Sequence, residues 1–214
     1  MHQLTDQVWW VSEALGAHCY LIDDPGRLIL IDPGLSLGLN RVARALHESG
    51  RSPRAVTHLL LTHYDGDHAQ AAAEWQRRTG ASVWLGAADA AILTGAVAVP
   101  TPFRRLMAGL MGVPELPGGL HLIQQQDEIL PGVQAIPTPG HTPGHFAFTY
   151  ADVAFIGDSA MVTKQGELTG MPGFLNCDPV AAARSLALVD SLDVAWRCAG
   201  HSAPRRASLT VAGR

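Results

Sequence analysis

The stretch Thr-His-Tyr-Asp-Gly-Asp-His, at residues 62–68, places four side chains that can bind a metal within six residues. They are His63, Asp65, Asp67 and His68. The apolar run Leu59–Leu61 comes directly before, as in a buried strand, and the alanine-rich residues 69–75 after it favour a helix. A polar turn would explain one or two of these side chains. Their density instead predicts a metal site on the loop that leaves the C-terminal end of a strand.

Three later stretches repeat this arrangement, each with a metal-binding residue just after an apolar strand. The residues are His141, Asp158 and His201. A glycine comes directly before each of them, and glycine permits tight turns and a close approach of the backbone to a site. Four such strand ends in one small domain predict that their side chains form a single constellation.

Length and composition indicate one globular domain, 1–214. The chain is 47% hydrophobic and 16% charged, which suits a substantial buried core. Its net charge is −4 and its only lysine is Lys164, so nucleic acid is not an expected partner. The three cysteines show no paired spacing and predict reduced thiols. The N-terminus does not resemble a signal peptide and no apolar run could span a membrane, so we expect a cytoplasmic protein without a membrane partner.

The apolar pattern predicts strands and helices along the whole chain. The expected strands are 7–11, 18–23, 27–31, 56–61, 82–85, 120–123, 133–137, 145–150, 153–157 and 194–198. The expected helices run from Ser36 to Gly50, over 68–79, over 87–94 and from Asp178 onward. Asp32, at the end of the third expected strand, is either a turn former or a carboxylate that supports a metal ligand.

The segment 95–119 differs in composition from the rest of the chain, because it is apolar, contains methionine and has proline and glycine at its ends. It has three interpretations: a helix packed on the core, a cover over the active site, or a contact in a homodimer. Flexible methionine side chains suit an adaptable binding surface. We therefore expect this segment to border the pocket for a small-molecule substrate. The residues on which this expectation depends are Phe103, Leu106, Met107, Leu110 and Met111.

The motifs, their order and their spacing resemble the metallo-β-lactamase-fold superfamily over nearly the whole chain. The matching stretches are 31–34, 62–68, 138–145, 157–158 and 200–201. The resemblance implies an α/β (α+β) fold, a four-layer αββα sandwich of two mixed sheets flanked by helices. It also implies a dinuclear site for two divalent metal ions at one edge of the sheets, with zinc as the usual metal and iron or manganese as alternatives.

The resemblance assigns ligands position by position. The implied ligands of one ion are His63, Asp65 and His141, and those of the other are Asp67, His68 and His201. Asp158 would bridge both ions. His145 belongs to the third motif but would be structural, and Asp32 would support the ligand loop.

Asp65 departs from the family pattern, which has His at this position. Carboxylates do occur there in the superfamily, as in the flavodiiron proteins. If Asp65 binds, the charges of two divalent ions, three carboxylates and a bridging hydroxide cancel, whereas His would leave one positive charge. Such a site should acidify its water less and tolerate iron or manganese better. The alternative is that Asp65 turns away and only the second ion binds tightly.

The resemblance implies a metal-dependent hydrolase. A metal-bridging hydroxide would attack an ester, thioester or lactone-type small molecule, with Asp67 holding or deprotonating the nucleophile. The alternative is a redox di-iron or mono-iron enzyme of the same fold, flavodiiron-like or persulfide dioxygenase-like. A metal-free binding module is disfavoured because the other ligand positions are filled. We expect neither a secreted antibiotic-resistance enzyme nor the added helical domain of typical hydroxyacylglutathione hydrolases.

Overall fold

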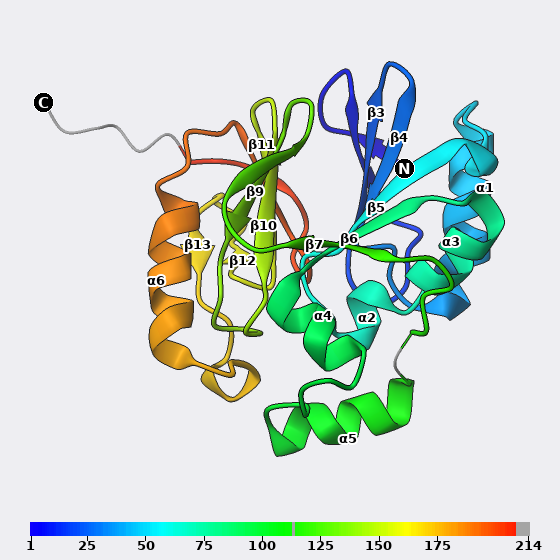
Figure 1. Ribbon diagram of the computed structural model, residues 1–214. Helices are drawn as coiled ribbons and strands as arrows, with labels where there is room; N and C mark the ends of the chain where they lie inside the picture. Colours follow the sequence, from blue (N-terminus) through cyan, green and yellow to red (C-terminus); the bar gives the residue numbers. More distant parts are fainter. Residues whose placement is uncertain (113, 209–214) are drawn as a thin grey trace, which may run out of the picture.

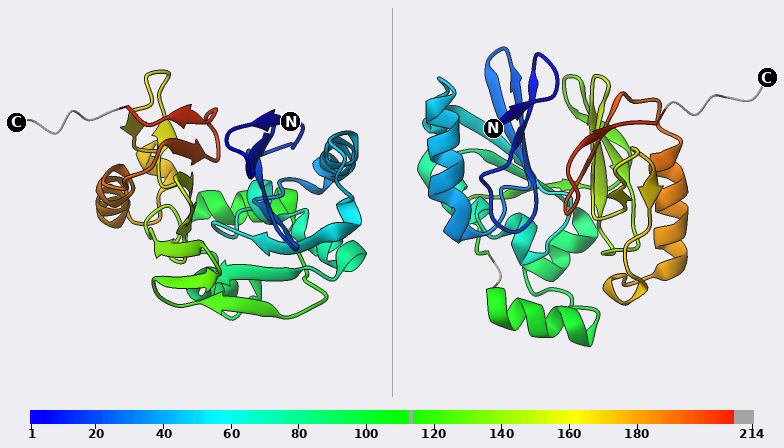
Figure 2. Two further views of the ribbon diagram at one scale, coloured as in Figure 1. Left: turned by 90° about the horizontal axis from the view of Figure 1, so that it is seen from above. Right: turned by 180° about the vertical axis from the view of Figure 1, so that it is seen from behind.

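Two β-sheets face each other in the computed structural model, and helices cover the outer face of each (Figure 1). The structure describes residues 1–112 and 114–208, without the side chain of Met111. Figure 2 shows the same layers from above, with α6 (Pro179–Asp190) outside one sheet and α1 (Leu39–Glu48) outside the other. The αββα sandwich expected from the sequence is confirmed.

The first sheet has seven strands, which lie side by side in the order of the sequence. They are β1 (His2–Gln3), β2 (Val8–Val11), β3 (Cys19–Asp24), β4 (Arg27–Ile31), β5 (Val56–Leu60), β6 (Ser82–Gly86) and β7 (Leu120–Ile123). The pairs from β1 to β4 are antiparallel, and those from β4 to β7 are parallel. Because parallel strands end at the same edge, the loops after β4, β5 and β6 are neighbours.

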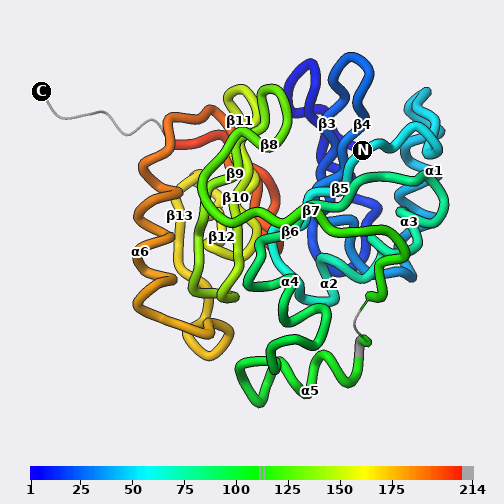
Figure 3. The backbone as a smooth tube through the Cα atoms, viewed as in Figure 1, coloured from blue at the N-terminus to red at the C-terminus, as the bar shows by residue number. Residues whose placement is uncertain are grey.

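The second sheet has the order β15-β14-β11-β10-β9-β8. Its strands are β8 (Asp127–Leu130), β9 (Val133–Pro137), β10 (Phe146–Tyr150), β11 (Val153–Gly157), β14 (Trp196–Ala199) and β15 (Arg205–Arg206). β11 and β14 are parallel and the other pairs are antiparallel, so this sheet is also mixed. The chain passes from the first sheet to the second between β7 and β8 (Figure 3). A separate small pair is formed by β12 (Met161–Val162) and β13 (Leu168–Thr169).

The core lies in three layers, and β4 shows how the sequence builds two of them. Leu28 and Leu30 face the helices outside the first sheet, where they join Val42 and Leu46 of α1. The alternate residues Ile29 and Ile31 point the other way, into the space between the two sheets. A third, smaller layer lies between the second sheet and α6.

The predicted helix 68–79 is wrong in one respect, because the structure divides it into α2 (Gly66–Ala69) and α3 (Ala72–Thr79). A continuous helix would join the Ala71 amide to the Asp67 carbonyl. Instead Ala71 N donates to Gly34 O at 2.8 Å, and Asp67 O accepts from Ala17 N at 3.0 Å. These tertiary hydrogen bonds replace the helical one and turn the chain just after the ligand loop.

The remaining helices are α4 (Ala87–Leu93) and α5 (Pro102–Met111). Short 3-10 turns are Ser36–Gly38, Pro53–Ala55 and Gly173–Leu175. β1, β8, β12, β13 and β15 were not expected from the sequence, because runs of two to four residues carry too little alternation. In the described part of the chain, no helix has the length and apolar character needed to cross a bilayer.

Candidate metal centre

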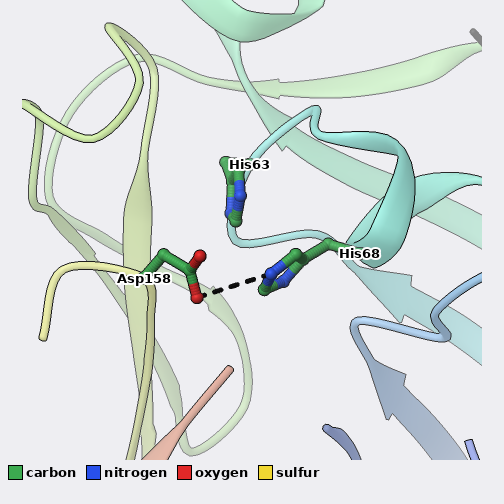
Figure 4. Close-up of side chains that lie close together, drawn as sticks. All are labelled: His63, His68 and Asp158. Carbon is green, nitrogen blue, oxygen red and sulfur yellow. Dashed lines mark ion pairs between the residues drawn. The ribbon is translucent and has the colours of Figure 1, made fainter. Parts of the chain in front are cut away.

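The seven side chains that the sequence singled out lie together at one edge of the sandwich. The loop after β5 and the start of α2 carry His63, Asp65, Asp67 and His68. The loops after β9, β11 and β14 carry His141, Asp158 and His201. Figure 4 shows His63 and His68 from one sheet and Asp158 from the other, with their polar atoms directed toward one another. The cluster therefore joins the two sheets.

His63, Asp65 and His141 form what we call the first group, and one ligand atom from each lies within 4.8 Å of the others. Asp65 Oδ2 is 3.4 Å from Nε2 of both histidines. This separation is long for a hydrogen bond. It matches the distance between two ligands at the corners of a tetrahedron around one ion, about 3.3–3.4 Å for metal–ligand bonds of about 2.0–2.1 Å. The spacing therefore fits a shared metal ion better than a hydrogen-bond network.

Asp67, His68 and His201 form the second group, with ligand atoms again within 4.8 Å of one another. Asp158 lies between the groups. Its Oδ1 is 3.4 Å from His68 Nε2, and its Oδ2 is 3.4 Å from Nε2 of His141 and of His201. The Asp158 carboxylate thus faces histidines of both groups, as a bridging ligand would require.

A hydrogen bond at the far side of the His63 ring leaves its Nε2 atom free for a metal. His63 Nδ1 lies 3.0 Å from Thr62 Oγ1, and that hydroxyl donates to Asp32 at 2.6 Å. His63 is fully buried, and its Nε2 has no hydrogen-bond partner among the described residues. A buried imidazole nitrogen that faces two carboxylates without a partner fits a metal ligand.

Asp32 holds the ligand loop in place. It accepts hydrogen bonds from Thr62 N at 2.8 Å and Thr62 Oγ1 at 2.6 Å, and its Oδ2 is 2.8 Å from His68 Nδ1. Its backbone has φ +49°, which is unusual for a residue with a side chain. The supporting carboxylate, rather than a simple turn former, is therefore the interpretation that the contacts favour.

His145 lies behind the cluster and uses both ring nitrogens within the protein. Nδ1 is 2.7 Å from Thr138 Oγ1, and Nε2 accepts from Asp158 N at 3.1 Å. Burial and the nearby His63 hold the pKa of His145 well below its ordinary value, so the ring is neutral. His145 thus positions the backbone at Asp158, which agrees with the structural role expected for it.

The carboxylates and histidines of the cluster shift one another's pKa values. Burial opposes ionisation of Asp158, but the histidines close around its carboxylate hold its pKa well below the ordinary range. Against burial, His201 and other histidines bring the pKa of Asp67 to about 2. The carboxylates of Asp158 and Asp67, whose Oδ2 atoms lie 3.4 Å and 3.1 Å from its Nε2, in turn raise the pKa of His201 to about 9. The carboxylates are therefore ionised at neutral pH, and a metal would displace the histidine protons as it binds.

Two side chains that sequence reasoning missed are buried beside the cluster. The first is Arg104 of α5, whose side chain is 5% exposed and forms an ion pair with Asp65 through Nη1 and Oδ2. Its Nη2 donates to the carbonyls of His141 at 2.9 Å and Leu175 at 2.8 Å. An arginine in an apolar helical segment gives no signal of such a role in the sequence.

The second missed side chain is Asp89 of α4, which is fully buried. It accepts hydrogen bonds from Tyr64 N at 3.1 Å, Thr142 Oγ1 at 2.7 Å and Gly144 N at 2.6 Å. Asp89 thereby ties the loop that carries His63 and Asp65 to the loop that carries His141. It lies on α4, between the ligand motifs, and no pattern in the sequence marks it.

Asp89→Asn is expected to change how stability depends on pH. Burial raises the pKa of Asp89 to about 6 from its ordinary 3.8, so the folded state binds this proton more tightly than the unfolded state. The stability that results is present below about pH 4 and is lost as the pH rises through about 6, by roughly 3 kcal/mol. Asparagine does not titrate. In urea unfolding with a chelator present, the parent should therefore lose stability relative to the variant between about pH 4 and pH 8.

Asp127→Asn provides the matched control for this experiment, because Asp127 is an exposed carboxylate on β8. Its pH dependence should follow that of the parent. Parallel curves for the parent and Asp89→Asn would contradict the raised pKa.

A cavity of about 390 Å³ opens directly onto the cluster. The segment 95–119 contributes Phe103, Arg104 and Met107 to its wall, as expected for a cover over the site, whereas Leu106 and Leu110 do not line it. The interpretation as a helix packed on the core is wrong, because Leu106 and Leu110 are 61% and 73% exposed. The side chain of Met111 lies outside the described part of the chain.

Residues 13–201 match the family model of the metallo-beta-lactamase superfamily, which is nearly the whole described chain. The chain belongs to this superfamily. Membership agrees with the strand order and with the place of the cluster at the edge of the sheets. At the level of the superfamily, it supports a metal-dependent hydrolase.

Individual superfamily members resemble the chain at low identity. A hydroxyacylglutathione hydrolase of Fuscovulum blasticum is 34% identical over 118 residues, which are 53% of this chain and 37% of that protein. The probable metallo-hydrolase YflN of Bacillus subtilis (strain 168) is 24% identical over 230 residues, covering 95% of this chain and 84% of that protein. The chain spans less than two thirds of the length of the first curated relatives it matches.

Among solved structures, TTHA1623 in a di-iron-bound form is similar to this chain. It is 26% identical, with a TM-score of 0.68 and 89% of each chain covered. That metal content describes TTHA1623 itself. It shows that two irons can be bound within a fold of this kind.

Proposed function

We propose that the protein is a hydrolase that binds two divalent metal ions through the seven-residue cluster and cleaves an ester, thioester or lactone-type small molecule. The observation that carries this proposal is the spacing of the cluster, with carboxylate oxygens 3.4 Å from histidine Nε2 atoms that face them. Divalent ions at such a site supply an activated water molecule as nucleophile and a Lewis acid for the substrate carbonyl.

Asp67 is the side chain best placed to act on the nucleophile. Its side chain is 25% exposed and lines the cavity, and its Oδ2 is 3.1 Å from His201 Nε2. As an ionised carboxylate it can accept a hydrogen bond from a water molecule and hold it for attack.

The cavity has a polar floor and apolar walls, which indicates a substrate with a hydrolysable group at one end and an apolar group at the other. The floor is formed by the cluster. The apolar part of the wall consists of Phe103, Met107, Met161, Met171, Pro172 and Leu175. Bound in this way, an acyl or alkyl group would rest against methionine side chains that can adapt to its shape.

A panel of esters, thioesters, lactones and β-lactams, graded by chain length, tests the proposal. Protein of known metal content should hydrolyse at least one oxygen or thiol ester class, more rapidly with longer apolar groups. A chelator should abolish the activity and a divalent metal should restore it. Activity that survives complete removal of metal would contradict the proposal.

Met107→Ala is expected to weaken binding of substrates with long apolar groups and to leave the metal content unchanged. Truncation removes about three buried heavy atoms from the wall, worth roughly 1–2 kcal/mol, so KM should rise about 5–30-fold. Short-chain substrates should be affected less. The matched control is Leu106→Ala on the same helix, because Leu106 points outward and is 61% exposed. Equal effects of the two variants would show that Met107 does not touch the substrate.

A redox enzyme is the second candidate, favoured by a carboxylate at position 65 and by the di-iron form of TTHA1623. Carboxylates suit harder ions such as iron. The candidate predicts iron in protein purified without added metal and consumption of oxygen with a reductant present. Zinc-loaded protein that hydrolyses the panel, together with iron-loaded protein that consumes no oxygen, would exclude it.

A further inference from the structure

Arg104 contacts the same carboxylate oxygen that faces the two histidines of the first group. Its Nη1 pairs with Asp65 Oδ2, and that oxygen is 3.4 Å from Nε2 of His63 and of His141. A carboxylate oxygen has two lone pairs and can receive a guanidinium N–H while the other lone pair faces a metal. The geometry therefore allows Asp65 to serve Arg104 and a metal ion together.

We propose that Arg104 is a positioning residue of the metal centre, and that the Asp65–Arg104 pair takes the place of one neutral ligand. This inference rests on the proposed metal-dependent function. The pair carries no net charge, as a histidine would carry none. The extra negative charge that Asp65 brings to the site is therefore balanced within the protein.

The surroundings fix Arg104 in this role. Its guanidinium is buried, and its Nη2 donates to the carbonyls of His141 and Leu175, so its orientation is set on the side away from Asp65. Among the described side chains of α5, Arg104 is the one that is buried. Figure 1 shows α5 at the outside of the molecule, beyond α2 and α4. Arg104 thus ties the helix to the ligand loop.

The contact between Arg104 and Asp65 reverses the effect that the sequence alone predicts for Asp65→His. If only the charges of the metal ligands are counted, Asp65→His should raise the charge of the site and favour zinc. With Arg104 present, the substitution instead leaves a buried guanidinium without its carboxylate, next to a site for cations. A buried charge that has lost its partner is strongly destabilising. Asp65→His alone should therefore damage both the fold and the metal site.

A rescue experiment tests the proposal with three variants: Asp65→His, Asp65→His/Arg104→Gln and Asp65→His/Arg105→Gln. Zinc affinity is measured by competition with a chelating dye, and the thermal midpoint is measured in excess chelator. Each variant is compared by its affinity for the more weakly bound of two zinc ions. Asp65→His should bind this ion about tenfold less tightly than Asp65→His/Arg104→Gln does. Its metal-free midpoint should also be lower, by about 2–8 °C. Arg105 is exposed on the same helix, so the Arg105 double variant should not recover.

Arg104→Gln alone provides a second measurement, which holds even if Asp65→His does not fold. In chelator it should melt below the parent, because Asp65 has lost its counter-ion. Zinc should then raise its midpoint more than it raises that of the parent, because the metal becomes the remaining cation near Asp65.

Equal zinc affinities and equal midpoints for Asp65→His and its Arg104 double variant would overturn the proposal. Rescue by the Arg105 double variant would also overturn it. Failure of the parent to bind zinc, iron or manganese would contradict the proposed function instead. In that case the midpoints in chelator would still decide whether Arg104 balances Asp65.

Discussion

Asp158→Ala should remove most of the metal from both positions of the centre. Asp158 places one oxygen 3.4 Å from His68 Nε2 and the other 3.4 Å from Nε2 of His141 and His201, so no other side chain of the cluster faces both groups in this way. Loss of residues that only support a ligand costs about 10–100-fold in metal affinity, and loss of a shared ligand should cost more. Elemental analysis after dialysis and the rate of hydrolysis should both fall, the rate by about 1000-fold or more.

His201→Ala and Asp127→Ala are the comparisons that give this result its meaning. His201 belongs to the second group alone and its side chain is 35% exposed, so its loss should release about one equivalent of metal. Asp127 is an exposed carboxylate on β8 and its removal should change neither quantity. If Asp158→Ala keeps its metal and its activity, the bridging role is wrong.

Gly200→Ala should have an effect of similar size without removing any ligand. A Cβ atom at this position would overlap Asp158 Oδ1 and lie 2.5 Å from His68 Cε1. Both side chains are almost completely buried, and His68 cannot move aside without losing its hydrogen bond to Asp32. We therefore expect metal affinity to fall at least about 100-fold, with a loss of stability of about 1–3 kcal/mol from overpacking.

Gly119→Ala separates this steric effect from a general effect of replacing glycine. A Cβ atom at Gly119 would meet nothing within 4 Å, so the variant should keep its metal and its thermal midpoint. Metal titration and thermal unfolding of the two variants make the comparison. Normal zinc affinity in Gly200→Ala would mean that the ligand cage is looser than its contacts indicate.

The fold and the position of the seven side chains at one edge could be predicted because local sequence patterns indicate both. Apolar runs that end in Gly and then His or Asp place these residues at strand ends, and parallel strands bring such ends together. The family resemblance then supplied the sandwich. That these side chains bind metal remains a prediction, which the Asp158 and His201 variants test.

The features that the sequence did not reveal depend on contacts between distant parts of the chain. Arg104 lies 39 residues from Asp65, and its role follows from burial rather than from any motif. Asp89 likewise acts through two loops that are separated in sequence. The break between α2 and α3 arises from hydrogen bonds to Gly34 and Ala17, which local helix propensity does not register.

Each sheet is built from a continuous half of the chain, and this affects the order in which the protein can mature. The first sheet uses strands between His2 and Ile123, and the second uses strands between Asp127 and Arg206. During synthesis the first half leaves the ribosome before the second, and it carries four of the seven donors, His63, Asp65, Asp67 and His68. The other three, His141, Asp158 and His201, follow β9, β11 and β14 of the second sheet. An incomplete chain therefore lacks Asp158 and one histidine of each group, so completion of the metal centre would mark the end of folding rather than its beginning.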